Sequence, residues 1–233
     1  MKKAFSLVEL SVVFSVIGLL VAAITAGSHL IYNSKVRNFV SQFNKIQTAV
    51  QTFKLNYKAL PGDFKDAQSF FTASLCPNNT NSSVNCDGDG DGYLENGENT
   101  YVFKHLSLAQ MFQGNFSPET VNPTNNYMPS SANSDPFSIS AEQTGLFSFW
   151  EHVSANLQYQ IYFAKVRTTS DGNFEKPVES VFDGKTAITI DRKIDDGVFS
   201  TGNLIITTGV ETTGCTSETS DVKCYGYWKE SKF

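Results

Sequence analysis

The chain opens with an apolar run that passes into an amphipathic pattern without a break. Residues 5–27 carry a single charged side chain, Glu9, and residues 10–27 carry none. About 20 apolar residues are enough to cross a bilayer as a helix. Lys2 and Lys3 precede the run and favour a cytoplasmic N-terminus, so the rest of the chain is expected to be translocated.

Over residues 28–57 the apolar positions recur mostly three or four residues apart, the period of a helix with one buried stripe. The stripe consists of Ile31, Val36, Phe39, Val40, Phe43, Ile46, Val50, Phe53 and Tyr57. Residues 5–57 are therefore predicted to form one continuous helix. Its first half is expected to lie in a membrane or to pack against neighbouring subunits, and its second half is expected to pack on a globular head. Pro61 and Gly62 end it, because proline disfavours helix at the residue before it.

The rest of the chain mixes helical and strand patterns, which predicts an α+β head with an antiparallel sheet. Asp63 is a candidate N-cap for a short helix over residues 64–71, and residues 101–112 also keep a helical spacing. Residues 113–142 have few aliphatic side chains and are expected to form a long surface excursion. Strands are predicted at residues 146–153, 157–167, 203–210 and 224–228. The pattern of residues 186–195 fits a strand or a helix.

Composition narrows the function classes. The chain has 233 residues, a net charge of -5 and a pI near 5.2. It lacks the clustered Lys and Arg of nucleic-acid binding, so no nucleic-acid partner is expected. No G-x-S-x-G, Walker, HExxH or dinucleotide pattern is present, and His29, His105 and His152 stand alone. The chain is not expected to be an enzyme, and a hydrogen-bonded structural role is favoured for His105.

Four cysteines form two pairs that are close in the sequence, Cys76 with Cys86 and Cys215 with Cys224. Metal-binding CxxC spacing is absent. An even number of cysteines behind an export signal favours two disulfides in an oxidising compartment. The alternative is four buried free thiols.

Residues 87–98 match the calcium-loop pattern D-x-D-x-D-G-x5-E at every defined position. Alternate carboxylates can converge on one hard cation, a backbone carbonyl at the seventh position can join them, and the final glutamate can bind with both oxygens. The candidate ligands are Asp87, Asp89, Asp91, Tyr93, Glu95 and Glu98. The alternative is a solvated acidic turn. Asp195 and Asp196 could hold a second cation, although a polar helix end is the simpler interpretation.

A carboxylate inside an apolar span needs a partner, and one is suggested by a resemblance. Residues 4–10, AFSLVEL, resemble the cleavage and methylation motif of type IV prepilins and type II secretion pseudopilins. The resemblance implies that a prepilin peptidase cuts between Ala4, where glycine is usual, and Phe5, whose new amine is methylated. It also implies that Glu9 pairs with the N-terminal amine of a neighbouring subunit during assembly.

Two further segments resemble a subgroup of these proteins, LPGDF at residues 60–64 and DRKIDDG at residues 191–197. The second one favours a helix over residues 186–195. The resemblance implies a pilin-like fold with a leader at residues 1–4, a membrane-spanning and fibre-core segment at 5–27, an amphipathic segment at 28–57 and a head at 58–233.

The function implied is that of a structural subunit, a pilin or pseudopilin, of a type IV pilus or type II secretion-like filament with a calcium-stabilised head. Its partners would be the prepilin peptidase, other pilin or pseudopilin subunits and the membrane. It would sit in the bacterial inner membrane and then in a periplasmic or cell-surface filament. The alternative is an exported or anchored calcium-binding adhesin or enzyme domain. Its ordinary signal sequence would be cut near Ala26.

Overall fold

The computed structural model describes residues 7–72, 74–76, 86–94, 98–113, 147–150, 157–163, 180–208, 215–218, 221 and 224–231. The chain divides into two compact units, residues 1–38 and 39–233. The expected leader, including Ala4 and Phe5, lies outside the described residues, as do Glu95, His152 and the predicted excursion after Gln113.

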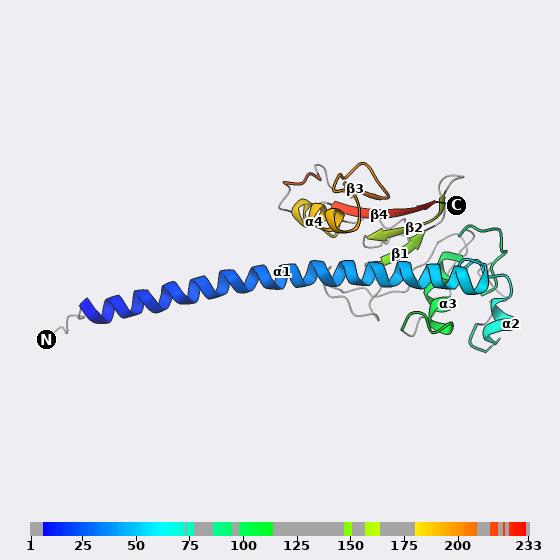
Figure 1. The fold of residues 1–233 in the computed structure, drawn as a ribbon, viewed down its shortest axis with the longest axis horizontal. Coiled ribbons are helices and arrows are strands. Elements are labelled where there is room, and N and C mark those ends of the chain that lie inside the picture. The colour runs from blue at the N-terminus through cyan, green and yellow to red at the C-terminus, as the bar shows by residue number, and fades with distance from the viewer. Residues whose placement is uncertain are drawn as a thin grey trace, which may run out of the picture. The chain divides into compact units, whose positions relative to one another are not determined.

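Helix α1 runs from Leu7 to Tyr57 and confirms the prediction of one continuous helix (Figure 1). It is long and apolar enough to cross a membrane, and its most apolar 18-residue window is wholly exposed. The hydroxyl groups in this part are satisfied within the helix. Ser11 Oγ donates to the carbonyl of Val8 at 2.9 Å, and Ser15 Oγ donates to that of Ser11 at 2.9 Å. Such bonds let short polar side chains sit in an apolar helix.

The second half of α1 buries the predicted stripe. Phe39, Phe43, Ile46, Val50 and Phe53 are at most 2% exposed. Ile31, the first member of the predicted stripe, is exposed instead, so the periodic pattern began one turn too early. Val36, the next member of the predicted stripe, is 1% exposed, so burial along α1 begins there and continues to Phe53.

A four-stranded antiparallel sheet lies in the second unit, with the order β1-β2-β4-β3. Each predicted strand region holds a strand among the described residues, and the last strand runs past its predicted end at Trp228. The strands are β1 Phe147–Trp150, β2 Leu157–Phe163, β3 Leu204–Thr208 and β4 Cys224–Ser231. In the register of the central pair, Ile161 lies opposite Trp228. On the other side of β4, Ile206 lies opposite Gly226.

Aromatic side chains join the sheet to α1 in this unit. Phe39 meets Phe163 edge-on with ring centroids 5.2 Å apart, and Phe43 meets Trp228 at 5.2 Å. A polar link lies beside them: Gln51 Nε2 and Trp228 Nε1 each donate to Glu230, both at 3.0 Å. Aromatic contacts of this kind contribute beyond the area they bury, so they hold the sheet in one register against the helix.

The short helices differ from the prediction at their ends. Helix α2 spans Ala67–Phe71, so the expected start at Phe64 was wrong, and Asp63 does not cap it. The region predicted as a helix over residues 101–112 is a 3-10 turn, η1 Glu98–Tyr101, followed by α3 Val102–Leu108. Gln110 then has a positive φ of 59°, which a continuing helix does not allow.

Helix α4, Gly184–Ile194, settles the ambiguous segment as a helix. Its N-cap is Asp183, whose Oδ1 accepts the backbone N–H of Thr186 at 2.7 Å. A side-chain acceptor at this position stabilises a helix start by about 1 kcal/mol. Ala187 and Ile190 form its buried side.

Both predicted disulfides are present, Cys76 to Cys86 and Cys215 to Cys224, so the free-thiol alternative is wrong. The first pair brings the two described ends of residues 76–86 together beside α2. The second pair ties Cys215 to the first residue of β4. Each bridge closes a loop of about ten residues, which in the loop-entropy model is worth roughly 3 kcal/mol.

Candidate metal centre

The acidic loop after Cys86 packs on the turn that follows α1. Asp63, in that turn, is only 1% exposed. Its Oδ1 accepts the backbone N–H of Gly90 at 2.5 Å, and its Oδ2 accepts that of Gly92 at 2.8 Å. Each carboxylate oxygen therefore holds one position of the loop, which makes Asp63 an organiser of the loop and not a helix cap.

Gly88 allows the acidic loop to approach the backbone of the turn that follows α1. A Cβ at position 88 would overlap the backbone of Asp63 and lie 2.8 Å from the carbonyl oxygen of Gly62. The N–H of Gly88 donates to the carbonyl of Phe64 at 3.2 Å. A larger side chain at position 88 would therefore push the loop away from Asp63.

Three carboxyl groups, named here the loop acids, converge at this contact. Asp63, Asp89 and Asp91 each place one carboxylate oxygen within 4.8 Å of the other two. Asp63 is buried, whereas Asp89 and Asp91 are exposed. A group of three carboxylates with one buried member can hold a hard cation that reaches it from solvent.

The loop acids are also held by turns within the loop. Asp89 Oδ1 accepts the N–H of Asp91 at 3.1 Å, and Asp91 Oδ1 accepts the N–H of Tyr93 at 2.8 Å. Glu98 Oε1 accepts the N–H of Asp89 at 2.9 Å, and this side chain is 7% exposed. Backbone N–H groups of the loop therefore bond to the carboxylates of its own acids.

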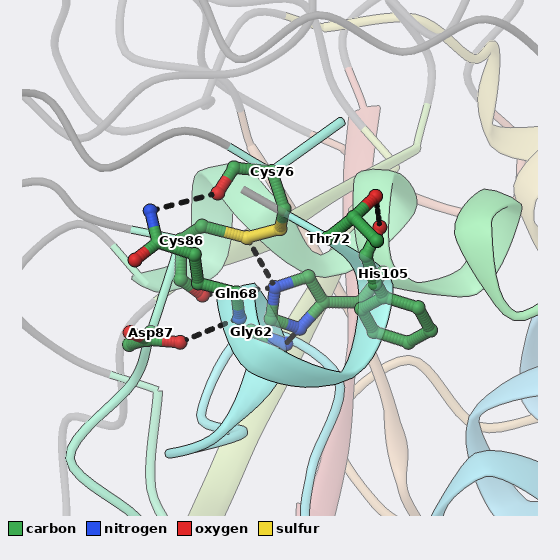
Figure 2. The surroundings of a disulfide bond; sticks show 8 residues. Gly62, Gln68, Thr72, Cys76, Cys86, Asp87 and His105 are labelled. Atoms are coloured by element: carbon green, nitrogen blue, oxygen red, sulfur yellow. Dashed lines mark hydrogen bonds between the residues drawn. A yellow bond between two sulfur atoms is a disulfide. The ribbon is translucent and has the colours of Figure 1, made fainter. Parts of the chain in front are cut away.

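Asp87, the first residue of the motif, serves the neighbouring helix. Its Oδ1 accepts the N–H of Gln68 in the first turn of α2 at 2.7 Å (Figure 2). Of the six predicted ligands, the structure brings Asp89 and Asp91 together with Asp63. Asp87 and Glu98 make the backbone bonds described above, Tyr93 follows Asp91 in the loop, and Glu95 lies outside the described residues.

The electrostatics of the loop acids suit a cation. Burial raises the pKa of Asp63 to about 6, against the opposing effect of the two N–H bonds, and the charges of Asp91 and Asp89 raise it further. A divalent cation would favour the ionised form of all three groups and reverse this effect. Because the donors are oxygens only, calcium or magnesium fits them better than a soft metal.

His105 fastens the same region from the side of α3. The N–H of Gly62 donates to Nδ1 at 2.8 Å, so Nδ1 is the acceptor and the proton sits on Nε2. Nε2 lies 3.0 Å from the carbonyl oxygen of Cys86, to which it donates, and near the disulfide sulfur (Figure 2). The ring is fully buried and stacks on Phe53. The predicted structural role of this histidine is confirmed by these bonds.

Two further groups of side chains bring possible ligand atoms together. Cys76, Cys86 and His105 bring ligand atoms within 4.8 Å of one another, but the disulfide removes both thiols from coordination. The other group is formed by Asp191, Asp195 and Asp196 at the end of α4. The loop acids thus hold two of the predicted ligands and one residue, Asp63, that sequence reasoning assigned to another role. The sequence signals at Asp63, an N-cap position and the LPGDF segment, do not point to a metal ligand.

Because His105 is buried, the free energy of unfolding is expected to depend on pH. Burial lowers its pKa from 6.5 to about 4. Above pH 6.5 the ring is neutral in both the folded and the unfolded chain. Between pH 6.5 and 4 only the unfolded chain takes up a proton, so the stability that the buried neutral ring contributes is lost as the pH falls. The full loss is roughly 3 kcal/mol.

We expect the stability difference between the wild type and His105→Gln to shrink by roughly 2 to 3 kcal/mol between pH 7 and 4.5. Urea unfolding with a chelator present measures it. Asp63 and Asp191, whose pKa values are raised to about 6, titrate with the opposite sign. They are present in both proteins, so the comparison cancels them. An equal difference at the two pH values would contradict the prediction.

Comparison of the chain with protein-family models, curated proteins and solved structures found no match.

Proposed function

We propose that the chain is a structural subunit, a pilin or pseudopilin, of a type IV pilus or a type II secretion-like filament. The observation that carries the proposal is the first part of α1. Its large apolar side chains stand in solvent in the isolated chain, with Leu7 85%, Leu19 73% and Ile24 70% exposed. An uninterrupted apolar helix surface of this length requires a membrane or other apolar helices around it.

An ordinary signal sequence or a plain anchor would also place an apolar helix at this end. Two features support the filament proposal over them. Glu9 is the single charged residue among the apolar residues 7–27, where a carboxylate is tolerated if a cation neutralises it. The same helix continues to Tyr57, and its residues 39–57 line the core of the second unit. A helix that is both the assembly element and part of the head would couple the head rigidly to a fibre.

The proposal includes a calcium ion at the loop acids. Asp89, Asp91 and the buried Asp63 would hold the ion and Glu98 would close the loop around it, as the motif implies. The ion would supply the positive charge that lets three carboxylates share one site. This chain's own contribution is the backbone scaffold, in which the N–H groups of Gly90 and Gly92 orient Asp63 before the ion arrives.

Mass spectrometry of the mature N-terminus tests the filament proposal. We expect the membrane-extracted protein to begin at Phe5 and to carry one added methyl group. Ala4→Gly, which restores the usual residue of the motif, is expected to be processed at least as completely. Ala4→Arg should block processing, because a bulky charged residue replaces the small one at the cut. A mature chain that begins near Gly27 would establish an ordinary signal sequence, and a chain that keeps Met1 would establish a plain anchor. Either result would refute the proposal.

A further inference from the structure

The end of helix α4 carries a second group of carboxylates, named here the α4 acids. Asp191 lies in the last turn of the helix, Asp195 is its C-cap and Asp196 follows. One carboxylate oxygen of each lies within 4.8 Å of the other two. The group shares no residue with the loop acids.

Asp191 is the unusual member, because it is fully buried. Its Oδ1 accepts the N–H of Gly197 at 3.2 Å. Its Oδ2 is also buried and has no hydrogen-bond partner in the part of the chain that the structure describes. A buried carboxylate oxygen without a partner is costly, and such atoms are rare unless a ligand or an ion satisfies them.

The other two carboxylates are held in place by the loop that leads to β3. Asp195 Oδ2 accepts the N–H of Leu204, the first residue of β3, at 2.7 Å. Asp196 Oδ1 accepts the N–H of Val198 at 2.8 Å, and its Oδ2 accepts the hydroxyl of Thr201 at 2.6 Å. These bonds fix the orientation of both side chains without a ligand, so binding need not order them.

A glycine makes room for this arrangement. Gly202 has a φ of +74°, and a Cβ there would overlap the carboxylate of Asp195. The backbone at position 202 therefore lies so close to the Asp195 carboxylate that no side chain fits between them. Substitution at position 202 would displace the carboxylate as well as strain the turn.

In the part of the chain that the structure describes, no basic side chain pairs with the α4 acids. Among the described residues, the bonds recorded for the three carboxylates go to backbone N–H groups and to the Thr201 hydroxyl. Arg192 extends over Gly197, but no ion pair with the three carboxylates is recorded for it. The negative end of the α4 dipole points at the same place and adds to the repulsion.

We propose that Asp191, Asp195 and Asp196 bind a divalent cation, and that the cation is calcium. All donors are oxygens, the buried Asp191 Oδ2 has no other partner among the described residues, and the two remaining side chains are already oriented. Calcium accepts several carboxylate ligands in irregular geometry, whereas magnesium demands near-octahedral order and keeps its waters. The bound ion would fasten the end of α4 to the start of β3. This site lies in the second unit and does not depend on filament assembly.

Equilibrium dialysis of the detergent-purified full chain against radioactive calcium tests the proposal. A chain that carries Asp89→Asn and Asp91→Asn has lost the loop site and is expected to bind one calcium. Adding Asp191→Asn should lower the affinity for that ion at least ten-fold. Glu218→Gln, which removes an exposed acid outside both groups, should leave the binding unchanged. Calcium binding of unchanged affinity after Asp191→Asn in this background would overturn the proposal, as would the absence of binding before it is added.

Melting curves distinguish a variant that has lost the calcium site from one that has lost its fold. Asparagine at position 191 can still accept the N–H of Gly197 and carries no charge. In chelator, Asp191→Asn should therefore melt no lower than its parent, and only the parent should melt higher when calcium is added. Asp196→Asn, at an exposed position, should weaken binding at least ten-fold with an unchanged circular dichroism spectrum. A calcium-induced rise that is the same in parent and variants would refute the site. Because the loop acids are removed throughout, failure here leaves the loop proposal standing.

Discussion

Glu9→Ala is expected to leave the chain inserted in the membrane and to reduce its incorporation into filaments about a hundred-fold. A carboxylate in the middle of a membrane costs ~2.5 to 3.5 kcal/mol on insertion scales, so alanine makes insertion easier. In the proposed fibre the same carboxylate faces the N-terminal amine of a neighbour. Removing one partner of a buried pair costs ~3 to 5 kcal/mol, because the other charge remains buried.

Immunoblots of sheared filaments and of membrane fractions measure this effect. Glu9→Asp keeps the charge on a shorter side chain and should retain part of the incorporation. Ser11→Ala is the matched control, since the Ser11 hydroxyl bonds only to its own helix at the carbonyl of Val8. It should assemble like the wild type. Normal incorporation of Glu9→Ala would exclude the pairing role of Glu9. The apolar helix would then be supported as a membrane anchor but not as an assembly element.

Removal of calcium is expected to lower the melting temperature of the fragment 28–233 by about 5 to 10 °C. Saturation at a hundred times the dissociation constant stabilises a protein by ~2.7 kcal/mol. In a domain of this size, 1 kcal/mol shifts the melting temperature by roughly 2 to 4 °C. The measurement belongs in a chain that also carries Asp191→Asn, so that only the loop acids respond to calcium.

In that background Asp89→Ala should abolish the dependence on calcium. Asp63→Asn should abolish it as well, although position 63 lies outside the sequence motif, because Asp63 is the buried member of the loop acids. Asp66→Asn is the matched control, an exposed acid three residues away that is not among the loop acids. A melting curve that chelator does not change would refute the loop site. A calcium effect that survives Asp63→Asn would limit the site to the motif residues.

Features that depend on residues close together in the sequence were predicted better than features that depend on residues far apart. Helix α1 was predicted almost to the residue, because its period is repeated over many turns. The disulfides were predicted because their cysteines are ten and nine residues apart. Helix α4 was ambiguous, since its β-branched residues favour a strand and its decisive cap, Asp183, lies before the periodic part.

The candidate sites were predicted only in part. The acidic motif identified Asp89 and Asp91, but it also nominated Asp87, whose carboxylate holds the first turn of α2. Asp63 was interpreted as a helix cap because aspartate is a preferred N-cap residue and stands directly before the predicted helix at residues 64–71. In the structure its oxygens accept N–H groups 27 and 29 residues later in the chain. No local pattern could indicate that contact.

The sequence by itself determined the elements whose signals are local: the continuous helix, the two cysteine bridges and the acidic loop beside them. Only the tertiary structure decided which carboxylates share a site and which are buried. Asp63 joins the loop because Gly88 lets two backbones touch, and Asp191 loses water because α4 packs with that side inward. Burial and close approach depend on what the rest of the chain places nearby. They alter the pKa of a carboxylate and can leave one of its oxygens without a hydrogen bond, and the neighbouring residues in the sequence do not reveal either effect.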